Sequence, residues 1–260
     1  MAGTNQSLQQ SSITQQPIII LVKPQLGENI GAVARAMLNC RLHQLRLVQP
    51  KETWPNEKSR KVCSGADIVI DNTKIFPNLK EAISDLQLVM ATTARIRDMV
   101  KPVYTPENAN QNIISSLSQN IQCGIVFGPE RTGLHNDDIA LCDAAIQIPL
   151  NPGFSSLNLA QSVLLIAYQW HIQTLQKNTS AKNFTRKTDI PAAKADLTYF
   201  FDRLEGHLTE GGFLRVEEKK ARMMRNIQNI FLKSQLTKQE LDTLQGIISC
   251  LVNIPSPKTK

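Results

Sequence analysis

The segment VFGPERTGLHNDD, Val126 to Asp138, has the glycine spacing of a ligand-binding loop. An apolar run ends at Gly128, and a second glycine follows at Gly133. Glycine allows main-chain groups to approach a ligand that a Cβ atom would keep away. A phosphate loop of the Walker type would continue with lysine and a hydroxyl residue, whereas Leu134 and His135 follow here. The pattern predicts a loop that cradles a ligand other than ATP, or an ordinary turn between a strand and a helix.

A second candidate segment is GENIGAVARAM, Gly27 to Met37. One apolar stripe runs along a helix here, formed by Ile30, Val33, Ala34 and Met37. Gly31 and Arg35 lie one turn apart and away from that stripe. We therefore expect the Arg35 guanidinium to point off the core, beside a glycine that leaves room for a phosphate or a ribose. The alternative is a surface arginine near the start of a helix.

The third candidate segment is IPLNPGFSSLNLAQSVLLIAYQW, Ile148 to Trp170. Its prolines and glycine predict a stiff loop, followed by a helix that Ser155 and Ser156 open as N-caps. The helix is apolar nearly all round, except for a polar stripe of Asn158, Gln161, Ser162 and Gln169. Such a helix must be covered on more than one side. We expect that cover to come either from its own sheet and the C-terminal part or from a second copy of the protein, with a dimer favoured.

The elements that position these segments alternate between strand and helix from Pro17 to about Gln176. The predicted strands are Ile18–Lys23, Leu45–Gln49, Ile68–Ile70, Leu86–Thr93, Gly124–Gly128 and Ala144–Leu150. This alternation predicts an α/β fold, a mainly parallel sheet with helices on both faces. Ligands of such sheets bind at the carboxyl ends of the strands. Thr92-Thr93-Ala94, the Gly128–Gly133 stretch and the chain after Ile148 all lie at those ends.

The chain divides by composition into four parts. We expect a disordered polar tail at residues 1–16, the α/β domain at 17–176, a polar linker at 177–192 and a small all-α domain of about three amphipathic helices at 193–260. Residues 1–176 hold 14 Lys and Arg against 13 Asp and Glu, while residues 177–260 hold 15 against 9. The basic C-terminal third favours a polyanionic partner, with nucleic acid first, although a solvated helical surface has a similar composition.

In the middle helix of that C-terminal part, apolar side chains recur at helical spacing. The predicted inner stripe is Met223, Met224, Ile227, Ile230 and Phe231, and the predicted outer face carries Arg222, Arg225, Asn229 and Lys233. The stripe is typical of core packing. The opposite face would meet RNA or water.

Cysteine and histidine usage argues against a disulfide-stabilised protein and against a zinc protein. The five cysteines are scattered without a C-x-x-C pair, and the four histidines show no ligand spacing. We expect reduced thiols in a cytoplasmic setting, with neither disulfides nor a metal site. No apolar run has the length of a membrane span, and the N-terminus has neither the basic nor the apolar region of a signal peptide.

The segments NIGAVARAM, FGPERTGL and IPLNPGFSSLNLAQSV resemble the three motifs of the SpoU-type ribose 2'-O-methyltransferases of the SPOUT superfamily. The similarity continues through GGFLR and LDTLQGII, and is greatest to the bacterial tRNA-modifying branch. It implies a deep trefoil knot at the carboxyl ends of the last strands, with S-adenosylmethionine as methyl donor and no metal. It also implies tRNA as partner and a homodimer in which the two copies share the active site.

The resemblance also implies roles for individual residues. The cofactor pocket would be formed by Thr92, Thr93, Ala94, Gly128, Gly133, Ile148, Ser155, Ser156 and Leu157. The catalytic set would be Arg35, Asn29, Glu130, Ser156 and Asn158, in which Glu130 holds Arg35 or a loop backbone, and Ser156 and Asn158 orient the ribose or Arg35. The RNA-binding set would be Arg35, Arg95, Arg97, Arg131, Arg222 and Arg225. Because arginine stays protonated in proteins, Arg35 is better suited to stabilise an alkoxide and clamp a phosphate than to act as a base.

The target implied by the resemblance is the 2'-hydroxyl of cytidine or uridine at nucleotide thirty-two, in the anticodon loop of tRNA. Alternatives are ribosomal RNA or another tRNA nucleotide, and a non-catalytic RNA-binding protein that retains the fold. A nicotinamide enzyme is disfavoured because KPQLGENIG does not supply the G-x-G-x-x-G fingerprint.

Overall fold

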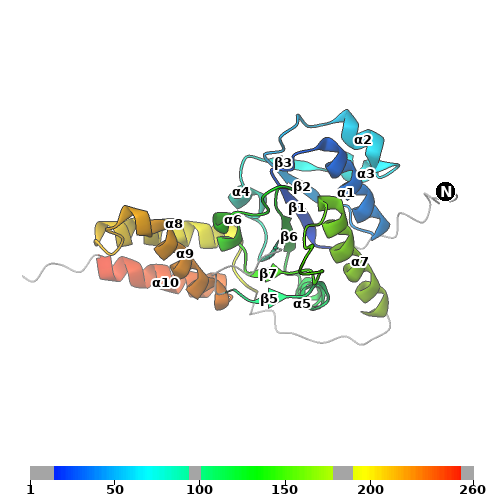
Figure 1. Ribbon diagram of the computed structural model, residues 1–260. Coiled ribbons are helices and arrows are strands. Elements are labelled where there is room, and N and C mark those ends of the chain that lie inside the picture. The colour runs from blue at the N-terminus through cyan, green and yellow to red at the C-terminus, as the bar shows by residue number, and fades with distance from the viewer. Residues whose placement is uncertain (1–14, 94–100, 178–189, 253–260) are drawn as a thin grey trace, which may run out of the picture.

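The computed structural model describes residues 15–93, 101–177 and 190–252, which include a central seven-stranded sheet (Figure 1). The described strands are β1 (Ile18–Val22), β2 (Leu45–Val48), β3 (Lys74–Phe76), β4 (Leu88–Thr92), β5 (Val103–Tyr104), β6 (Cys123–Phe127) and β7 (Ala144–Ile146). Their order across the sheet is β3-β2-β1-β6-β4-β7-β5, and each neighbouring pair is parallel. All the carboxyl ends therefore lie at one edge of the sheet.

Helices cover both faces of the sheet. Those between residues 15 and 177 are α1 (Gly27–Asn39), α2 (Glu57–Cys63), α3 (Asp67–Asp71), α4 (Leu79–Ala82), α5 (Pro106–Ser118), α6 (Asn136–Ala140) and α7 (Leu159–Lys177). One core lies between the sheet and α1, α5 and α7, and the other lies between the sheet and α4 and α6. The predicted α/β class, with helices on both faces of a parallel sheet, is confirmed.

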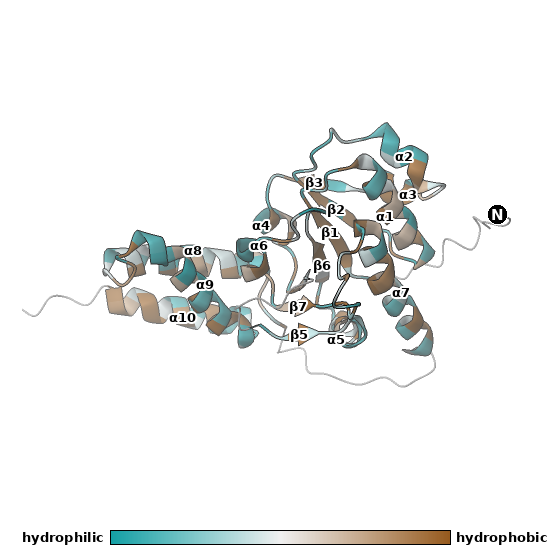
Figure 2. Ribbon diagram, in the orientation of Figure 1, coloured by the Kyte–Doolittle hydropathy of each residue, from teal (hydrophilic) through white to brown (hydrophobic). Residues whose placement is uncertain are grey.

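Strand β1 shows how the sequence builds this arrangement. Successive side chains of a strand point to opposite faces. Ile19 and Leu21 therefore enter the first core, whereas Ile18, Ile20 and Val22 enter the second. Both sets must be apolar, which explains the uninterrupted run IIILV and the hydrophobic colour of the central strands in Figure 2. The trefoil knot is implied by the family resemblance and stays a prediction.

The strand prediction was wrong at Ile68–Ile70, which lies in helix α3. Val69 and Ile70 are buried while Ile68 is half exposed, a pattern that a helix turning on the surface of α1 produces. Three apolar residues are too few to distinguish a helix from a strand by periodicity. The short strands β3 and β5 were missed because they pair at the sheet edges with few buried residues.

The C-terminal part is helical, as predicted. Its helices are α8 (Lys194–Glu210), α9 (Glu217–Lys233) and α10 (Lys238–Val252), and they extend from the side of the sheet that carries α4 and α6 (Figure 1). They share a core in which the Phe200 and Phe231 rings meet edge to face at 5.0 Å. The backbone N–H of Lys194 donates to the Leu86 carbonyl at 2.8 Å, which docks the start of α8 on the sheet domain.

The predicted faces of α9 need correction at two positions. Asn229, expected on the outer face, is 7% exposed, and Ile230, expected inside, is 65% exposed. Met224 and Leu232 are the buried apolar residues, so the inner face is rotated relative to the prediction. The buried face is rotated because α9 packs against α6 of the sheet domain as well as against the other C-terminal helices.

Residues at the borders of the predicted tail and linker belong to the folded part, including Lys177, the last residue of α7. Gln16, assigned to the polar tail, is buried, and its side-chain oxygen accepts the backbone N–H of His43 at 2.8 Å. Ala192, assigned to the linker, is also buried, and its backbone N–H donates to the Leu236 carbonyl. Residues 1–14 of the predicted tail and 178–189 of the predicted linker lie outside the described residues. Within the described ranges, no helix is long and apolar enough to cross a membrane.

Candidate functional site

A pocket lies at the carboxyl edge of the sheet, where the chain leaves β4, β6 and β7. It is lined by all the predicted cofactor-binding residues except Ala94, which lies outside the described residues: Thr92, Thr93, Gly128, Gly133, Ile148, Ser155, Ser156 and Leu157. Parallel pairing brings these loops together, because adjacent strands end at the same edge. Residues missed by the sequence prediction, such as Ile146 and Ser162, are neighbours of the predicted segments along the chain.

Asn29 connects the three candidate segments. Its side-chain Nδ2 donates to Glu130 Oε1 at 2.8 Å, and its Oδ1 accepts from Asn158 Nδ2 at 3.0 Å. One amide on α1 thus links the loop after β6 to the loop after β7. Because these hydrogen bonds join residues far apart in the sequence, they hold the two pocket loops in a defined relation to α1.

The Glu130 carboxylate also holds main chain. Its Oε2 accepts the backbone N–H of Gln25 at 3.0 Å, just before α1. Of the two predicted roles for Glu130, holding a loop backbone or holding Arg35, the structure shows the contact to backbone. No hydrogen bond joins Glu130 to Arg35 within the described part of the chain.

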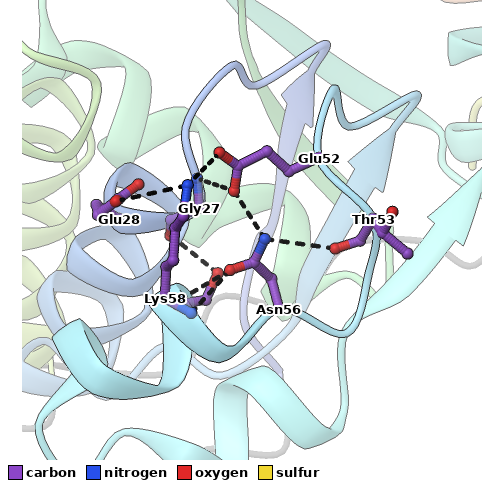
Figure 3. A network of polar contacts seen from close by, with 7 residues as sticks. Gly27, Glu28, Glu52, Thr53, Asn56 and Lys58 are labelled. Atoms are coloured by element: carbon purple, nitrogen blue, oxygen red, sulfur yellow. Dashed lines mark hydrogen bonds and ion pairs between the residues drawn. The ribbon is translucent and has the colours of Figure 1, made fainter.

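A second carboxylate, that of Glu52, also binds the start of α1 (Figure 3). Glu52 accepts the backbone N–H of Gly27 at 3.3 Å, together with Asn56 Nδ2 at 2.7 Å and Lys58 Nζ at 2.8 Å. These contacts, led by the Lys58 ammonium, hold the pKa of Glu52 below its usual range. Carboxylates are favourable at a helix N-terminus because of the helix dipole. The sequence gives no local signal for this role, since Glu52 lies after a different strand.

The space beside Gly31 differs from the sequence prediction, whereas the exposure of Arg35 agrees with it. A Cβ atom at Gly31 would lie 2.3 Å from the carbonyl oxygen of Ser59, so the space is filled by the backbone of α2 and is not free for a ligand. Arg35 does project from the core into solvent, where its Nη1 contacts Ser64 Oγ at 3.4 Å. Arg35 does not line the pocket of its own chain.

The two loop glycines have separate structural reasons. A Cβ atom at Gly128 would lie 2.2 Å from the backbone nitrogen of Leu134, so the loop can fold back on itself only with glycine there. Gly133 has a φ of +65°, which disfavours other residues, and the space that a Cβ would enter is open. Together they expose main chain on one wall of the pocket.

Helix α7 begins later than predicted. Ser155 and Ser156 are exposed in the loop before it, and Leu159 is its first residue. Asn158 takes the capping role, because its Oδ1 accepts the backbone N–H of Ala160 at 2.8 Å. Asn158 therefore caps α7 with one side-chain atom and binds Asn29 with the other.

The predicted RNA-binding arginines lie in different places. Arg131 is exposed at the pocket, and Arg222 is exposed on α9. Arg225 pairs with Asp137 of α6 at 2.7 Å, so it joins the C-terminal helices to the helix that follows the pocket loop. Arg95 and Arg97 lie outside the described residues.

The fold and the site together define an α/β protein with a pocket of three loops at the carboxyl edge of a parallel sheet. Comparison with known proteins identifies the family: the SpoU rRNA methylase family matches residues 16–168, and the C-terminal domain of the tRNA methyltransferase TrmJ matches residues 195–256. The chain belongs to the SpoU methylase family and, within it, to the TrmJ-type proteins, as the motifs predicted. Among the described residues, no group of histidine, cysteine or acidic side chains has the arrangement of a metal site.

Individual relatives cover almost the whole chain. The TrmJ of Salmonella typhimurium, named a tRNA (cytidine/uridine-2'-O-)-methyltransferase, is 34% identical over 90% of this chain and 95% of its own. A tRNA/rRNA methyltransferase of Haemophilus influenzae, of uncharacterised function, is 31% identical over 90% and 93%. The crystal structure of TrmJ from Z. mobilis ZM4 superposes with a TM-score of 0.82 at 42% identity, covering 92% of this chain and all of that one.

Proposed function

We propose that this protein transfers a methyl group from S-adenosylmethionine to the ribose 2'-hydroxyl of cytidine or uridine in tRNA, at nucleotide thirty-two of the anticodon loop. The observation that carries the proposal is the three-loop pocket joined through Asn29 in a chain of the TrmJ type. The relatives' names support the pyrimidine and the tRNA. The nucleotide position rests on the motif resemblance.

The residues of the pocket fit a nucleoside cofactor without a phosphate chain. Main chain around Gly128 and Gly133 offers hydrogen-bonding groups, while Ile148 and Leu157 offer apolar surface. Arg131 is the one basic side chain among the described residues that line the pocket. A polyphosphate would need more positive charge than this, whereas adenosine and a methionine side chain need mostly shape and main-chain partners.

When bound, S-adenosylmethionine supplies an already activated methyl group, so the main task of the chain is to align the ribose hydroxyl with it. Ser156, exposed at the pocket, orients the ribose in this proposal, and Asn158 holds the loop beside it through its hydrogen bonds to α7 and Asn29. Because a guanidinium group is cationic and has several donors, that of Arg35 stabilises the developing alkoxide and clamps the neighbouring phosphate.

Arg35 reaches a pocket only if a second copy of the chain brings its own α1 to the loops, so the proposal includes a homodimer with a shared active site. The outer face of α7 supports it, because Leu165 and Tyr168 are 41% and 53% exposed there. The C-terminal helices lie on the opposite side of the sheet and leave this face uncovered (Figure 1). A second copy packed there would cover this outer face of a helix that is apolar on both sides.

The deciding experiment is transfer of labelled methyl from S-adenosylmethionine to tRNA that lacks its native modifications, with the product nucleotide mapped by mass spectrometry. We expect a 2'-O-methylpyrimidine in the anticodon loop. Label in ribosomal RNA, or at another tRNA nucleotide, would preserve the enzyme class and overturn the target. Binding of cofactor and RNA without transfer would support a non-catalytic RNA-binding protein instead.

The Arg35→Ala variant tests the proposed mechanism. We expect turnover to fall by at least about 10²-fold, the usual effect of removing one group that stabilises a developing oxyanion. Affinity for S-adenosylmethionine should stay unchanged, because Arg35 is assigned to the ribose oxygen and phosphate of the RNA, whereas the cofactor is assigned to the pocket loops. Arg41→Ala, at an exposed arginine just after the same helix, is the matched control and should keep full turnover.

A further inference from the structure

Phe154 is the most exposed large apolar side chain in the described part of the chain, with 75% of its surface open to solvent. Single exposed apolar side chains are common on protein surfaces, so exposure alone carries no function. Phe154 differs from the others in its place, because it lies in the loop that joins β7 to α7 and forms one wall of the pocket. The proposed chemistry leaves this ring without a role.

A tight turn places Phe154 at the rim of the pocket. Its backbone N–H donates to the Asn151 carbonyl at 2.9 Å, and the Asn151 side-chain oxygen accepts the backbone N–H of Gly153 at 3.0 Å. Such a turn keeps the Cα atoms of its first and last residues within about 7 Å of each other. The residues on either side of the turn, Leu150 and Ser155, both line the pocket, whereas Phe154 does not. The ring is therefore attached beside the pocket and extends into solvent.

The base of a nucleotide whose ribose enters the pocket would lie close to this ring. Ser156, which orients the ribose in the proposed function, is two residues from Phe154, so their Cα atoms are at most about 7 Å apart. The base is attached to the ribose carbon next to the one that bears the 2'-hydroxyl. When the hydroxyl is held at Ser156, the base therefore lies at the mouth of the pocket, within reach of a phenylalanine ring on the rim.

Aromatic stacking suits a site that accepts both pyrimidines. Cytosine has an amino donor at ring position 4, where uracil has a carbonyl acceptor. A fixed hydrogen-bonding partner for that position would reject one of the two bases. The flat face of the ring is similar in both, and unpaired bases of RNA commonly stack on aromatic side chains. An exposed phenylalanine ring thus binds either base without reading its edge.

We propose that Phe154 stacks on the base of the target nucleotide and so holds that nucleotide out of the RNA loop, with its ribose in the pocket. The inference rests on the proposed function, because it assumes that the methyl acceptor is the ribose of cytidine or uridine. It adds a residue that contacts the substrate base to the residues predicted for the cofactor, the ribose and the RNA backbone. It also explains how one site accepts two bases.

Steady-state methyl transfer by the full-length protein to tRNA without native modifications tests the proposal. We expect Phe154→Ala to raise the KM for tRNA by about 10-fold, the usual effect of removing one stack between a base and an aromatic ring. The kcat should stay nearly unchanged, because the stack is present both before and during the reaction. Phe154→Tyr should recover most of the loss. Phe213→Ala, at an exposed phenylalanine between α8 and α9, is the matched control and should keep the parental KM.

A synthetic tRNA with an abasic ribose at the methylated nucleotide, which keeps its 2'-hydroxyl, identifies what the ring contacts. The parent protein should lose about 10-fold in kcat/KM on this substrate. Phe154→Ala should lose nothing further, because the variant and the substrate lack the two sides of the same contact. Losses that multiply would show that the ring contacts something other than the target base, and would overturn the proposal.

Other results would also overturn the inference. A parental KM in Phe154→Ala, or an equal loss in Phe213→Ala, would remove the specific role of the ring. Weaker binding of S-adenosylmethionine in calorimetry would place Phe154 in the cofactor site, and a monomer in light scattering would place it between two copies of the chain. Absence of methyl transfer from the parent protein to any RNA would overturn the proposed function and this inference with it, whereas the other results overturn the inference alone.

Discussion

Replacing Lys194 by methionine should destabilise the protein strongly. Lys194 is the first residue of α8, its side chain is 4% exposed, and its Nζ lies 2.5 Å from Asp143 Oδ1. The Asp143 side chain is 12% exposed, and its other oxygen accepts the backbone N–H of Val89 at 2.7 Å. Methionine retains most of the buried stem of lysine, so the substitution removes the ammonium with little change in packing.

The expected loss is about 3 kcal/mol in the free energy of unfolding. Breaking a buried ion pair by removing one partner costs about 3–5 kcal/mol, because the remaining charge has lost its compensation. The lower end applies here, since Asp143 keeps the hydrogen bond from Val89 and has the ammonium of Lys101 in its neighbourhood. For a chain of this size, that loss lowers the urea midpoint by about 1 M.

Urea unfolding followed by circular dichroism at pH 7 measures the effect. Adding Asp143→Asn to Lys194→Met should restore part of the stability, because the neutral amide no longer leaves a buried charge while its oxygen still accepts from Val89. Lys80→Met serves as a surface control. It breaks the exposed Lys80–Asp202 pair at 3.3 Å and should cost less than about 1 kcal/mol. A Lys194→Met protein no less stable than this control would refute the reasoning.

Three further predictions concern the thiols, the dimer and the pocket. In the native protein, a thiol reagent at pH 8 should modify the exposed Cys250 rapidly and the four buried cysteines only after unfolding. Burial protects these thiols and, for example, raises the pKa of the Cys40 thiol to about 11. Rapid modification of more than one thiol would contradict the fold. Tyr168→Glu on the outer face of α7 should yield an inactive monomer by light scattering, whereas an active monomer would exclude a shared site. Asn29→Ala should weaken cofactor binding by about 10-fold in calorimetry, because Glu130 and Asn158 each lose a hydrogen-bond partner. Unchanged affinity would show that the pocket loops keep their positions without Asn29.

Local patterns sufficed for much of the fold. The apolar stripe of α1 is buried as its spacing predicted, and the strands that bear the pocket loops follow the apolar runs, although β7 ends at Ile146, before Leu150. Such patterns succeed because each buried face imposes its own periodicity on the sequence. They failed at Ile68–Ile70, where the run was too short to show a period, and at Asn229, where a second neighbouring helix rotated the buried face.

The sequence by itself determined which segments would meet at the pocket, because parallel strands end at one edge and the motifs follow those strands. Tertiary structure alone decided the polar contacts between them. The Asn29 side chain binds Glu130 and Asn158, which lie 101 and 129 positions further along the chain. Gly31 makes room for the backbone of α2 and not for a ligand, and the Lys101 ammonium binds the carbonyl of Cys142. Hydrogen-bond partners at such separations depend on strand order and loop shape, which local periodicity does not encode.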